Sequence, residues 1–305
     1  NDLNVTDPNT PSSQTFWSNA IAAEQGVVAT YNALLRLGTT QRWWAFAHDL
    51  RSDIGTSTSP WPELRAFVRH EFPSGYDVPF TSDTWNDTYV LIGRANQAIA
   101  NIPQIPMDTA RRSDLVGEAK FLRGWGYFHL ITLFGGNLPL ITTPQVAADR
   151  PASSDSAAIF RQIEADFRDA AAALPIAVGS PRATRGAAQG MLGKVQLQQR
   201  KWAEAAATLL PVVQGQVGAY ALVPEYARLF RVDGNNSVES LFESQMGNVV
   251  LCGQGLCGNN VSRMIGPRGP SFADGFPTRW YFREFFRDST VDGRVDPRLD
   301  ATIFY

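Results

Sequence analysis

The residues of this sequence that could do chemistry are mainly aromatic, and they lie in or directly after stretches that lack helical periodicity. Trp61 and Tyr76 lie in residues 51–82, a stretch rich in proline, serine and threonine. Trp280 and Tyr281 follow a second stretch rich in glycine and proline. Exposed aromatic rings stack on the C–H faces of sugars, while neighbouring polar groups bond sugar hydroxyls. The pattern therefore indicates a carbohydrate-binding surface with these four rings as candidate ligand contacts.

Two adjacent tryptophans, Trp43 and Trp44, are harder to interpret. Neighbouring residues of a helix cannot face the same way. We expect one of the pair in the core and the other near the surface, and we count Trp44 among the candidate ligand-binding residues. Three other tryptophans fall within helical patterns and are expected to pack helices together: Trp85, Trp125 and Trp202.

No catalytic arrangement is visible. His129 lies in an apolar segment and is expected to be a core residue, while His48 and His70 each precede an acid whose side chain points away. The nucleophile elbow, the phosphate-binding loop, the dinucleotide-binding glycines and the zinc-protease motif are all missing. We therefore expect a protein that is not an enzyme and that needs no cofactor.

The two cysteines, Cys252 and Cys257, lie close together in a glycine-rich segment. A local disulfide would stabilise the fold by about 2 kcal/mol in an oxidising compartment, with two free thiols as the alternative. No histidine or further cysteine lies within twenty residues, which argues against zinc. The regular spacing of Asp288, Asp292 and Asp296 lacks the order of a calcium loop. We expect no metal site.

Composition narrows the possible classes of protein. A chain of 305 residues with 44% hydrophobic residues can bury a large core in one domain or two. A net charge of −2 gives no long-range attraction to nucleic acid. No run of 18 apolar residues could span a membrane, and the polar opening NDLNVTDPNTPSS is not a signal peptide. We expect a processed or trimmed N-terminus.

Residues 114–142 are the stretch around which the chain is organised. The segment from Trp125 to Phe134 is apolar on nearly every face, so other helices should surround it. Gly135 and Gly136 end this helix, and Pro139 prevents its continuation. Because glycine is unfavourable inside a helix, the three helical glycines should mark points where another backbone comes close: Gly117, Gly124 and Gly126.

Periodicity predicts a mainly helical chain with little β structure. Ser154 is the expected N-cap of the helix over 153–174, and Pro175 follows its end. Residues 184–213 resemble a tetratricopeptide helix–turn–helix, in which small residues let paired helices nest. A strand is expected over 238–245, irregular structure over 51–82 and 247–278, and an unpaired apolar end over 301–305. Helices are expected over 14–37, 41–50, 84–101, 109–134, 153–174, 184–199, 202–213 and 279–287, with a short helical turn within 220–230.

A specific motif accompanies this pattern. GEAKFLRGWGYFHLITLFGGNLPLIT is preceded by Trp85-x3-Tyr89 and by Arg94-Ala95-Asn96, and together they resemble the signature of the SusD/RagB family of outer-membrane nutrient-binding lipoproteins. The family usually has Ala at the position of Gly124, and its members are longer. Other matching pieces occur in the family's order: Asp7-Pro8-Asn9, Tyr220-Ala221-Leu222, Leu229-Phe230, Glu239 to Glu243 and Asp296-Pro297-Arg298.

The resemblance implies a fold, a role and a location. The fold would be mainly α, a tetratricopeptide-like superhelix of helical pairs with long irregular loops. Residues 1–305 would form a single SusD-like domain that lacks a C-terminal portion, with a helical scaffold over 14–217 and a loop-rich region over 218–305. The protein would bind a glycan or oligosaccharide, or a peptide, without enzymatic action. It would deliver this nutrient to a SusC-like TonB-dependent transporter at the cell surface. An N-terminal lipid, absent from this chain, would be its membrane anchor.

Two alternatives remain open. A tetratricopeptide-type scaffold for another protein would place its contacts on helices in a concave groove. A helical-barrel glycosidase would bring two carboxylates together in one cleft. The aromatic residues in predicted loops favour the glycan-binding interpretation over both.

Overall fold

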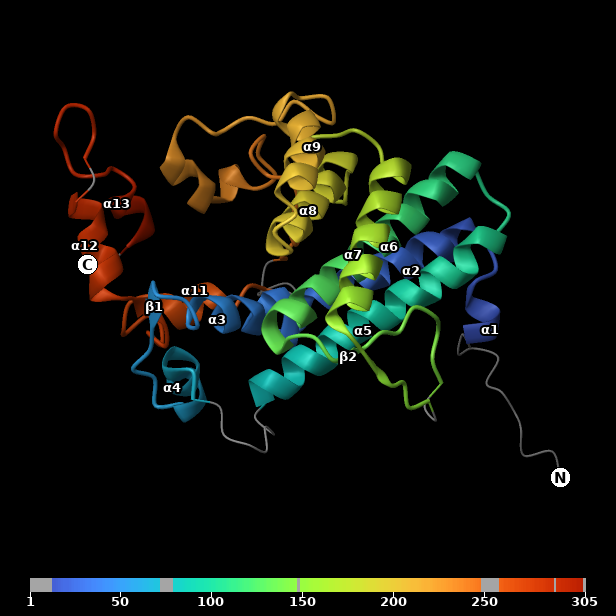
Figure 1. Cartoon of the computed structure of the whole chain (residues 1–305), viewed down its shortest axis with the longest axis horizontal. Helices are drawn as coiled ribbons and strands as arrows, with labels where there is room; N and C mark the ends of the chain where they lie inside the picture. Colours follow the sequence, from blue (N-terminus) through green and yellow to red (C-terminus); the bar gives the residue numbers. More distant parts are fainter. Residues whose placement is uncertain (1–12, 72–78, 147–148, 248–257, 288, 304–305) are drawn as a thin grey trace.

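A computed structural model describes residues 13–71, 79–146, 149–247, 258–287 and 289–303. It is mainly helical, and its long helices pack side by side in chain order while the C-terminal elements extend the molecule at one end (Figure 1). The first half contains α1 (Ser13–Phe16), α2 (Ala20–Asn32), η1 (Ala33–Leu35), η2 (Leu37–Gln41), α3 (Trp43–Asp49), β1 (Gly55–Thr56), α4 (Pro62–Arg69), α5 (Pro79–Asn101), η3 (Ile102–Gln104), α6 (Thr109–Phe134), β2 (Leu138–Pro139) and β3 (Ser153–Ser154). The second contains α7 (Ser156–Ala173), α8 (Arg185–Gln198), α9 (Trp202–Val213), η4 (Tyr226–Phe230), η5 (Val232–Gly234), α11 (Val261–Ile265), β4 (Phe276–Pro277), α12 (Arg279–Arg287) and α13 (Leu299–Thr302).

Helix α6 is the centre of the core, as the sequence predicts. The Asp108 carboxylate caps it by accepting a hydrogen bond from the Arg111 amide at 2.8 Å, and Gly135 ends it with φ of 80°. Helices α5 and α7 pack along it, and α8 and α9 continue the layer (Figure 1). Large side chains of α6 are almost completely buried in this arrangement, among them Phe121, Leu122, Tyr127 and Leu130.

The helical glycines lie where neighbouring helices approach closely, and the atoms nearest to them belong to side chains of those helices. A Cβ atom on Gly117 would lie 2.9 Å from the Cβ of Ala173, and one on Gly126 would lie 3.1 Å from Ile92. A Cβ atom on Gly124 would lie 3.2 Å from the Cβ of Asp166. The glycines therefore bring α6 close to α5 and α7 through side-chain packing.

A buried ion pair joins α6 to α7. The guanidinium group of Arg123 donates to both carboxylate oxygens of Asp166, at 2.9 and 2.6 Å. Its remaining nitrogen donates to Asn96 Oδ1 at 2.9 Å and to the carbonyl of Thr142 at 3.0 Å. The amide of Asn96 in turn donates to the carbonyl of Ile141 at 2.9 Å. The polar residues of the sequence motif thus fix the chain as it leaves α6.

The structure corrects several predicted elements. The stretch 51–82 is not wholly irregular, because it contains β1 and α4, with Pro62 at the first position of α4. Residues 238–245 form no strand; instead Phe242 packs against Trp125 with ring centroids 4.3 Å apart. The N-cap of α7 is Asp155 and not Ser154, which lies in β3. Near the C-terminal end, residues 299–302 form the short helix α13.

Two short antiparallel ladders and two isolated bridges, Arg268 with Ser271 and Ser289 with Val295, are the β structure of the described residues. In one, Leu138 and Pro139 of β2 pair with Ser154 and Ser153 of β3. In the other, Gly55 pairs with Pro277, which joins β1 to β4 across most of the sequence. The amide of Thr278 also donates to the carbonyl of Ile54 at 2.8 Å. This second ladder brings the region around α4 next to the C-terminal elements.

The ring of His129 stacks on Trp44 with centroids 3.8 Å apart and an interplanar angle of 8°. Burial lowers the pKa of His129 well below its ordinary value, and the charges of His48 and Lys194 lower it further. The prediction of a core histidine is consistent with this packing. Sequence inspection did not reveal that His48 Nε2 lies 3.3 Å from His129 Nδ1.

Protein stability should fall as the pH drops below about 6.5, because the unfolded chain then binds a proton that folded His129 resists. The loss is at most about 1.4 kcal/mol per pH unit for each such proton. Urea unfolding at about pH 7.5 and about pH 5.5 measures it. His129→Gln should weaken the dependence, whereas His70→Gln, at an exposed position, should preserve it. Equal pH dependence in both variants would contradict this account.

Candidate functional site

Trp61 is the most prominent of the predicted aromatic contacts. It lies at the N-cap of α4, and its side chain is 43% exposed. Its ring packs against the buried Trp43, with centroids 5.9 Å apart at an angle of 44°. The exposed ring is therefore held in place by a ring of α3. Such a fixed aromatic face can stack on a flat apolar surface without first being ordered.

Polar groups surround this aromatic pair. The indole N–H of Trp43 donates to Asp83 Oδ2 at 3.4 Å, and the guanidinium group of Arg42 lies 5.0 Å from the Trp43 ring centroid. Burial lowers the pKa of Arg42, and the charges of Asp274 and Asp83 oppose this shift. Within the described part of the chain, Arg42 Nε is buried and has no hydrogen-bond partner. We call Arg42, Trp43, Trp61, Asp83 and Asp274 the Trp61 cluster.

Hydrogen bonds from the β1 side fix the backbone before Trp61. The hydroxyl of Ser59 donates to Asp274 Oδ1 at 2.6 Å and accepts from the Trp61 amide at 3.2 Å. The hydroxyl of Ser57 donates to the Asp274 carbonyl, and Arg65 donates to the Ser59 carbonyl. The segment after β1 is thus tied to the segment before β4, and both position the Trp61 cluster.

Among the described residues, the other predicted contacts are not members of this cluster. Trp280 is 54% exposed and Tyr281 is partly buried, and both lie on α12. Because β1 and β4 are antiparallel, the chain leads from them toward Trp61 at one end of the ladder and toward Trp280 at the other. Trp44 is 3% exposed, so the expectation that one of the adjacent tryptophans lies near the surface is wrong. Tyr76, Cys252 and Cys257 lie outside the described residues.

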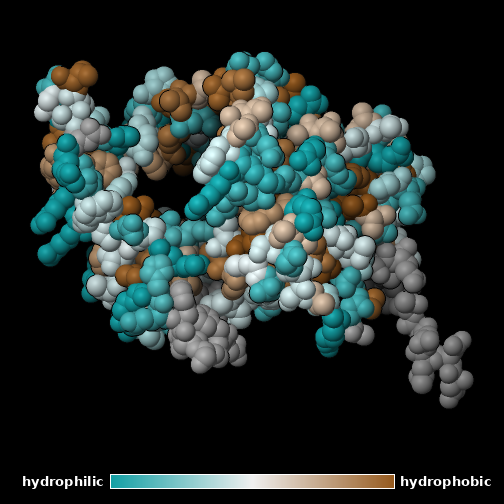
Figure 2. All heavy atoms as spheres, viewed as in Figure 1, coloured by the Kyte–Doolittle hydropathy of each residue, from teal (hydrophilic) through white to brown (hydrophobic). Residues whose placement is uncertain are grey.

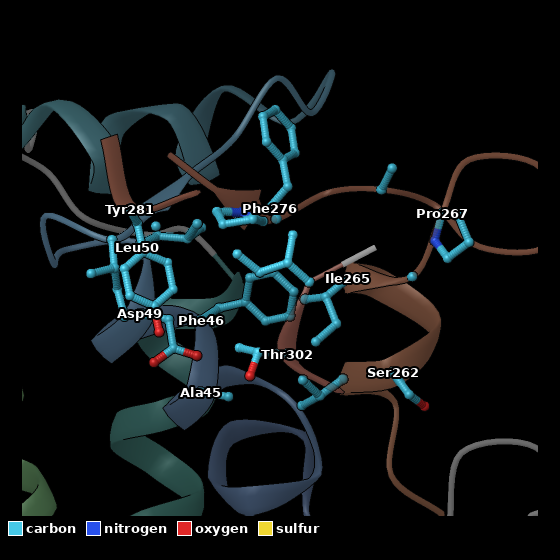
Figure 3. Close-up of a pocket in the computed structure, with 18 residues that line it drawn as sticks. Ala45, Phe46, Asp49, Leu50, Ser262, Ile265, Pro267, Phe276, Tyr281 and Thr302 are labelled. Carbon is cyan, nitrogen blue, oxygen red and sulfur yellow. The ribbon is translucent and has the colours of Figure 1, made fainter. Parts of the chain in front are cut away.

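A cavity of about 500 Å³ opens beside the ladder, between α3, α11, β4 and α13 (Figure 3). In Figure 3, the ring of Phe46 forms the middle of its wall, with Tyr281 and Asp49 on one side and Ile265 on the other. The Phe46 ring also contacts Trp43, with centroids 6.2 Å apart. A chain of aromatic rings therefore runs from the exposed face of Trp61 to this cavity.

The walls of the cavity are mainly apolar, and Asp49 is a charged residue among them. Partial burial raises the pKa of the Asp49 carboxyl group. Among the residues that the structure describes, this carboxylate accepts no hydrogen bond and forms no ion pair. It is therefore available to a hydrogen-bond donor inside the cavity.

Sequence reasoning did not identify the polar members of the Trp61 cluster. Arg42, Asp83 and Asp274 come from three segments that are far apart in the chain, and none belongs to a short motif. Phe46 of the cavity reads as an ordinary core position of α3. Helix α4, which carries Trp61 at its N-cap, was also missed, although its sequence contains a signal. Pro62 and the spacing of Leu64 and Phe67 are typical of an amphipathic helix.

Two kinds of site are absent from the part of the chain that the structure describes. No group of three or more histidine, cysteine, aspartate or glutamate side chains could hold a metal ion there. No helix there is long and apolar enough to cross a membrane.

Trp202, which we expected to pack helices, is 61% exposed on α9, whereas Trp85 and Trp125 pack against the core as expected.

The amino-acid sequence is similar to known proteins over half of the chain or more. A family model for SusD-like proteins, described as starch-binding and associating with the outer membrane, matches residues 21–197. One SusD-like protein of Formosa agariphila is 31% identical over 159 residues, covering 50% of this chain and 30% of that protein. A second is 28% identical over 229 residues, covering 72% and 44%. The chain therefore spans less than half the length of these curated relatives.

Solved structures are similar over nearly the whole chain. A structure described as a laminarin-binding SusD-like protein superposes with a TM-score of 0.82 at 27% identity, covering 94% of this chain and 66% of that one. A SusD superfamily protein from Bacteroides vulgatus superposes with a TM-score of 0.80 at 22% identity, covering 93% and 61%. At 22% identity, the similarity to the Bacteroides vulgatus structure shows the fold alone. The superpositions confirm the predicted fold class, mainly α and tetratricopeptide-like.

Proposed function

Because this chain belongs to the SusD-like family, we propose that it binds a glycan on the surface organised by Trp61. The observation that carries this proposal is an exposed indole ring held against a second indole, with charged side chains beside it. Stacking would engage the C–H face of a sugar ring, and the guanidinium and carboxylate groups would bond its hydroxyls. The laminarin-binding relative supports a polysaccharide as the ligand.

The proposal extends to the setting of the protein. We infer that it acts without catalysis, as a surface-exposed lipoprotein of the outer membrane. It would present its glycan to a SusC-like TonB-dependent transporter. The family description, which associates starch binding with the outer membrane, supports this placement. We also propose that residues 14–217 form the helical scaffold and residues 218–305 the loop-rich region of one SusD-like domain.

The decisive experiment is calorimetric titration with laminarin, starch and a panel of other polysaccharides, and with peptides. Trp61→Ala should weaken glycan binding by about 2 kcal/mol, or roughly thirty-fold, because it removes the anchoring ring. Trp202→Ala is the matched control, since Trp202 is an exposed tryptophan on α9. Circular dichroism should show unchanged helix content in both variants.

The possible outcomes separate the candidate functions. Glycan binding that survives Trp61→Ala would refute the site. Peptide binding alone would keep a nutrient-binding role but change its substrate. Binding of another protein in place of any glycan or peptide would favour the tetratricopeptide scaffold.

A further inference from the structure

Two neighbouring cavities share walls at the C-terminal end of the molecule. The apolar cavity of about 500 Å³ is described above, and a second cavity of about 380 Å³ lies beside it. Tyr281 and Thr302 line both. The space-filling view shows the C-terminal elements at one end of the molecule, where hydrophobic and hydrophilic residues lie side by side on the surface (Figure 2). Two compartments of different chemistry therefore meet at Tyr281.

The second cavity is polar but close to neutral. Its carboxylates are already paired: Glu284 bonds Arg287 at 2.8 Å, and Asp296 bonds Arg298 at 2.9 Å. Tyr226 of η4 adds a phenol group, with its oxygen 3.4 Å from Thr302 Oγ1. Compensated charges and hydroxyl groups suit a neutral ligand with many hydroxyls better than an ion.

The first cavity suits an apolar part of a ligand instead of a sugar. Phe46, Ile265 and Phe276 give it aromatic and aliphatic walls, and Asp49 offers a carboxylate without a partner in the described structure. Its volume lies in the range of pockets that hold small organic molecules. A flat aromatic group fits inside it, and a hydroxyl group on that ring, other than the oxygen joined to the sugar, could donate to Asp49.

We propose that these two cavities form a second binding site, distinct from the Trp61 cluster, for an aryl glycoside. Its sugar occupies the polar cavity beside Tyr226, and its aromatic group passes Tyr281 into the apolar cavity. The inference extends the proposed glycan binding to glycans that carry an aromatic substituent, but it depends on different residues. The two halves of the ligand gain affinity because they are joined, since binding of one raises the local concentration of the other.

Titration with 4-methylumbelliferyl and methyl glycosides of glucose, galactose and xylose tests this proposal. At least one umbelliferyl glycoside should bind about tenfold or more tightly than both its methyl glycoside and free 4-methylumbelliferone. Binding is followed by calorimetry and by the fluorescence of the coumarin ring.

Ile265→Trp should fill the apolar cavity and remove this advantage, because Ile265 lines it and is 51% exposed. Ile176→Trp is the matched control, at an isoleucine that is 53% exposed and lines neither cavity. Both variants should keep the polysaccharide affinity attributed to Trp61. If polysaccharides fail to bind while the aryl glycosides bind, the Trp61 proposal fails and this one stands.

Two results would overturn the second site. Equal affinities of methyl and umbelliferyl glycosides for every sugar would show that the apolar cavity contributes nothing. Free umbelliferone that binds as tightly as its glycosides would show that the polar cavity contributes nothing.

Discussion

Asp166→Ala should destabilise the fold by about 3–5 kcal/mol, because it leaves the buried charge of Arg123 without its partner. The two side chains are 1% and 6% exposed, so water cannot replace the lost carboxylate. Two of the four hydrogen bonds that Arg123 donates go to Asp166. Urea unfolding followed by circular dichroism measures the loss.

Asp169→Ala is the control on the same helix. Asp169 bonds Lys120 at 2.6 Å, but the side chains are 54% and 25% exposed. An exposed pair of this kind contributes less than about 1 kcal/mol. The double variant Arg123→Met with Asp166→Leu should be much less destabilised than Asp166→Ala, because no buried charge remains. Equal losses in Asp166→Ala and Asp169→Ala would refute the argument.

Gly38→Ala should cost about 3 kcal/mol and should also weaken ligand binding. A Cβ atom at Gly38 would lie 2.0 Å from the carbonyl oxygen of Asp83, which belongs to backbone and cannot rotate away. The Gly38 amide also donates to Asp87 Oδ2 at 2.9 Å. Displacing the backbone at Asp83 moves its carboxylate away from the indole of Trp43, so the Trp61 cluster loses its geometry.

Gly93→Ala provides the contrast. Gly93 lies within α5, and no atom outside its own helix surroundings lies within 4 Å of a Cβ atom placed there. Alanine should stabilise this helix by about 0.5–1 kcal/mol. Thermal unfolding and polysaccharide titration of both variants check the prediction. A Gly38→Ala protein with wild-type stability would show that the segment adjusts without strain.

The long helices were predictable because their signals are local. Helix α6 runs from Thr109 to Phe134, as the sequence predicts. Its N-cap residue, its apolar faces and its terminating glycine all lie within or directly beside this segment. The motif around Asn96 and Arg123 identified the family for the same reason. Its residues Asn96 and Arg123 bond each other and the carbonyl groups of the chain that leaves α6.

The proposed binding surface was less predictable because its residues meet only in three dimensions. Trp61 was found because an aromatic residue stood out in a segment rich in proline. Its neighbours Arg42, Asp83 and Asp274 gave no signal, since charged residues are common on any surface. The burial of both Trp43 and Trp44 arises because α3 is enclosed on two sides: Trp44 faces His129 of α6, while Trp43 faces Trp61.

The ladder between β1 and β4 has a consequence for the order of folding. Closing a loop of this length costs roughly 5 kcal/mol of chain entropy, whereas successive helices such as α6 and α7 meet through short connections. The helical layer should therefore form early, and the joining of Thr278 to Ile54 should come late. Hydrogen exchange at the Thr278 amide should then be faster than at amides in the middle of α6. That single amide reports whether both proposed binding surfaces have assembled, even when helix content is already complete.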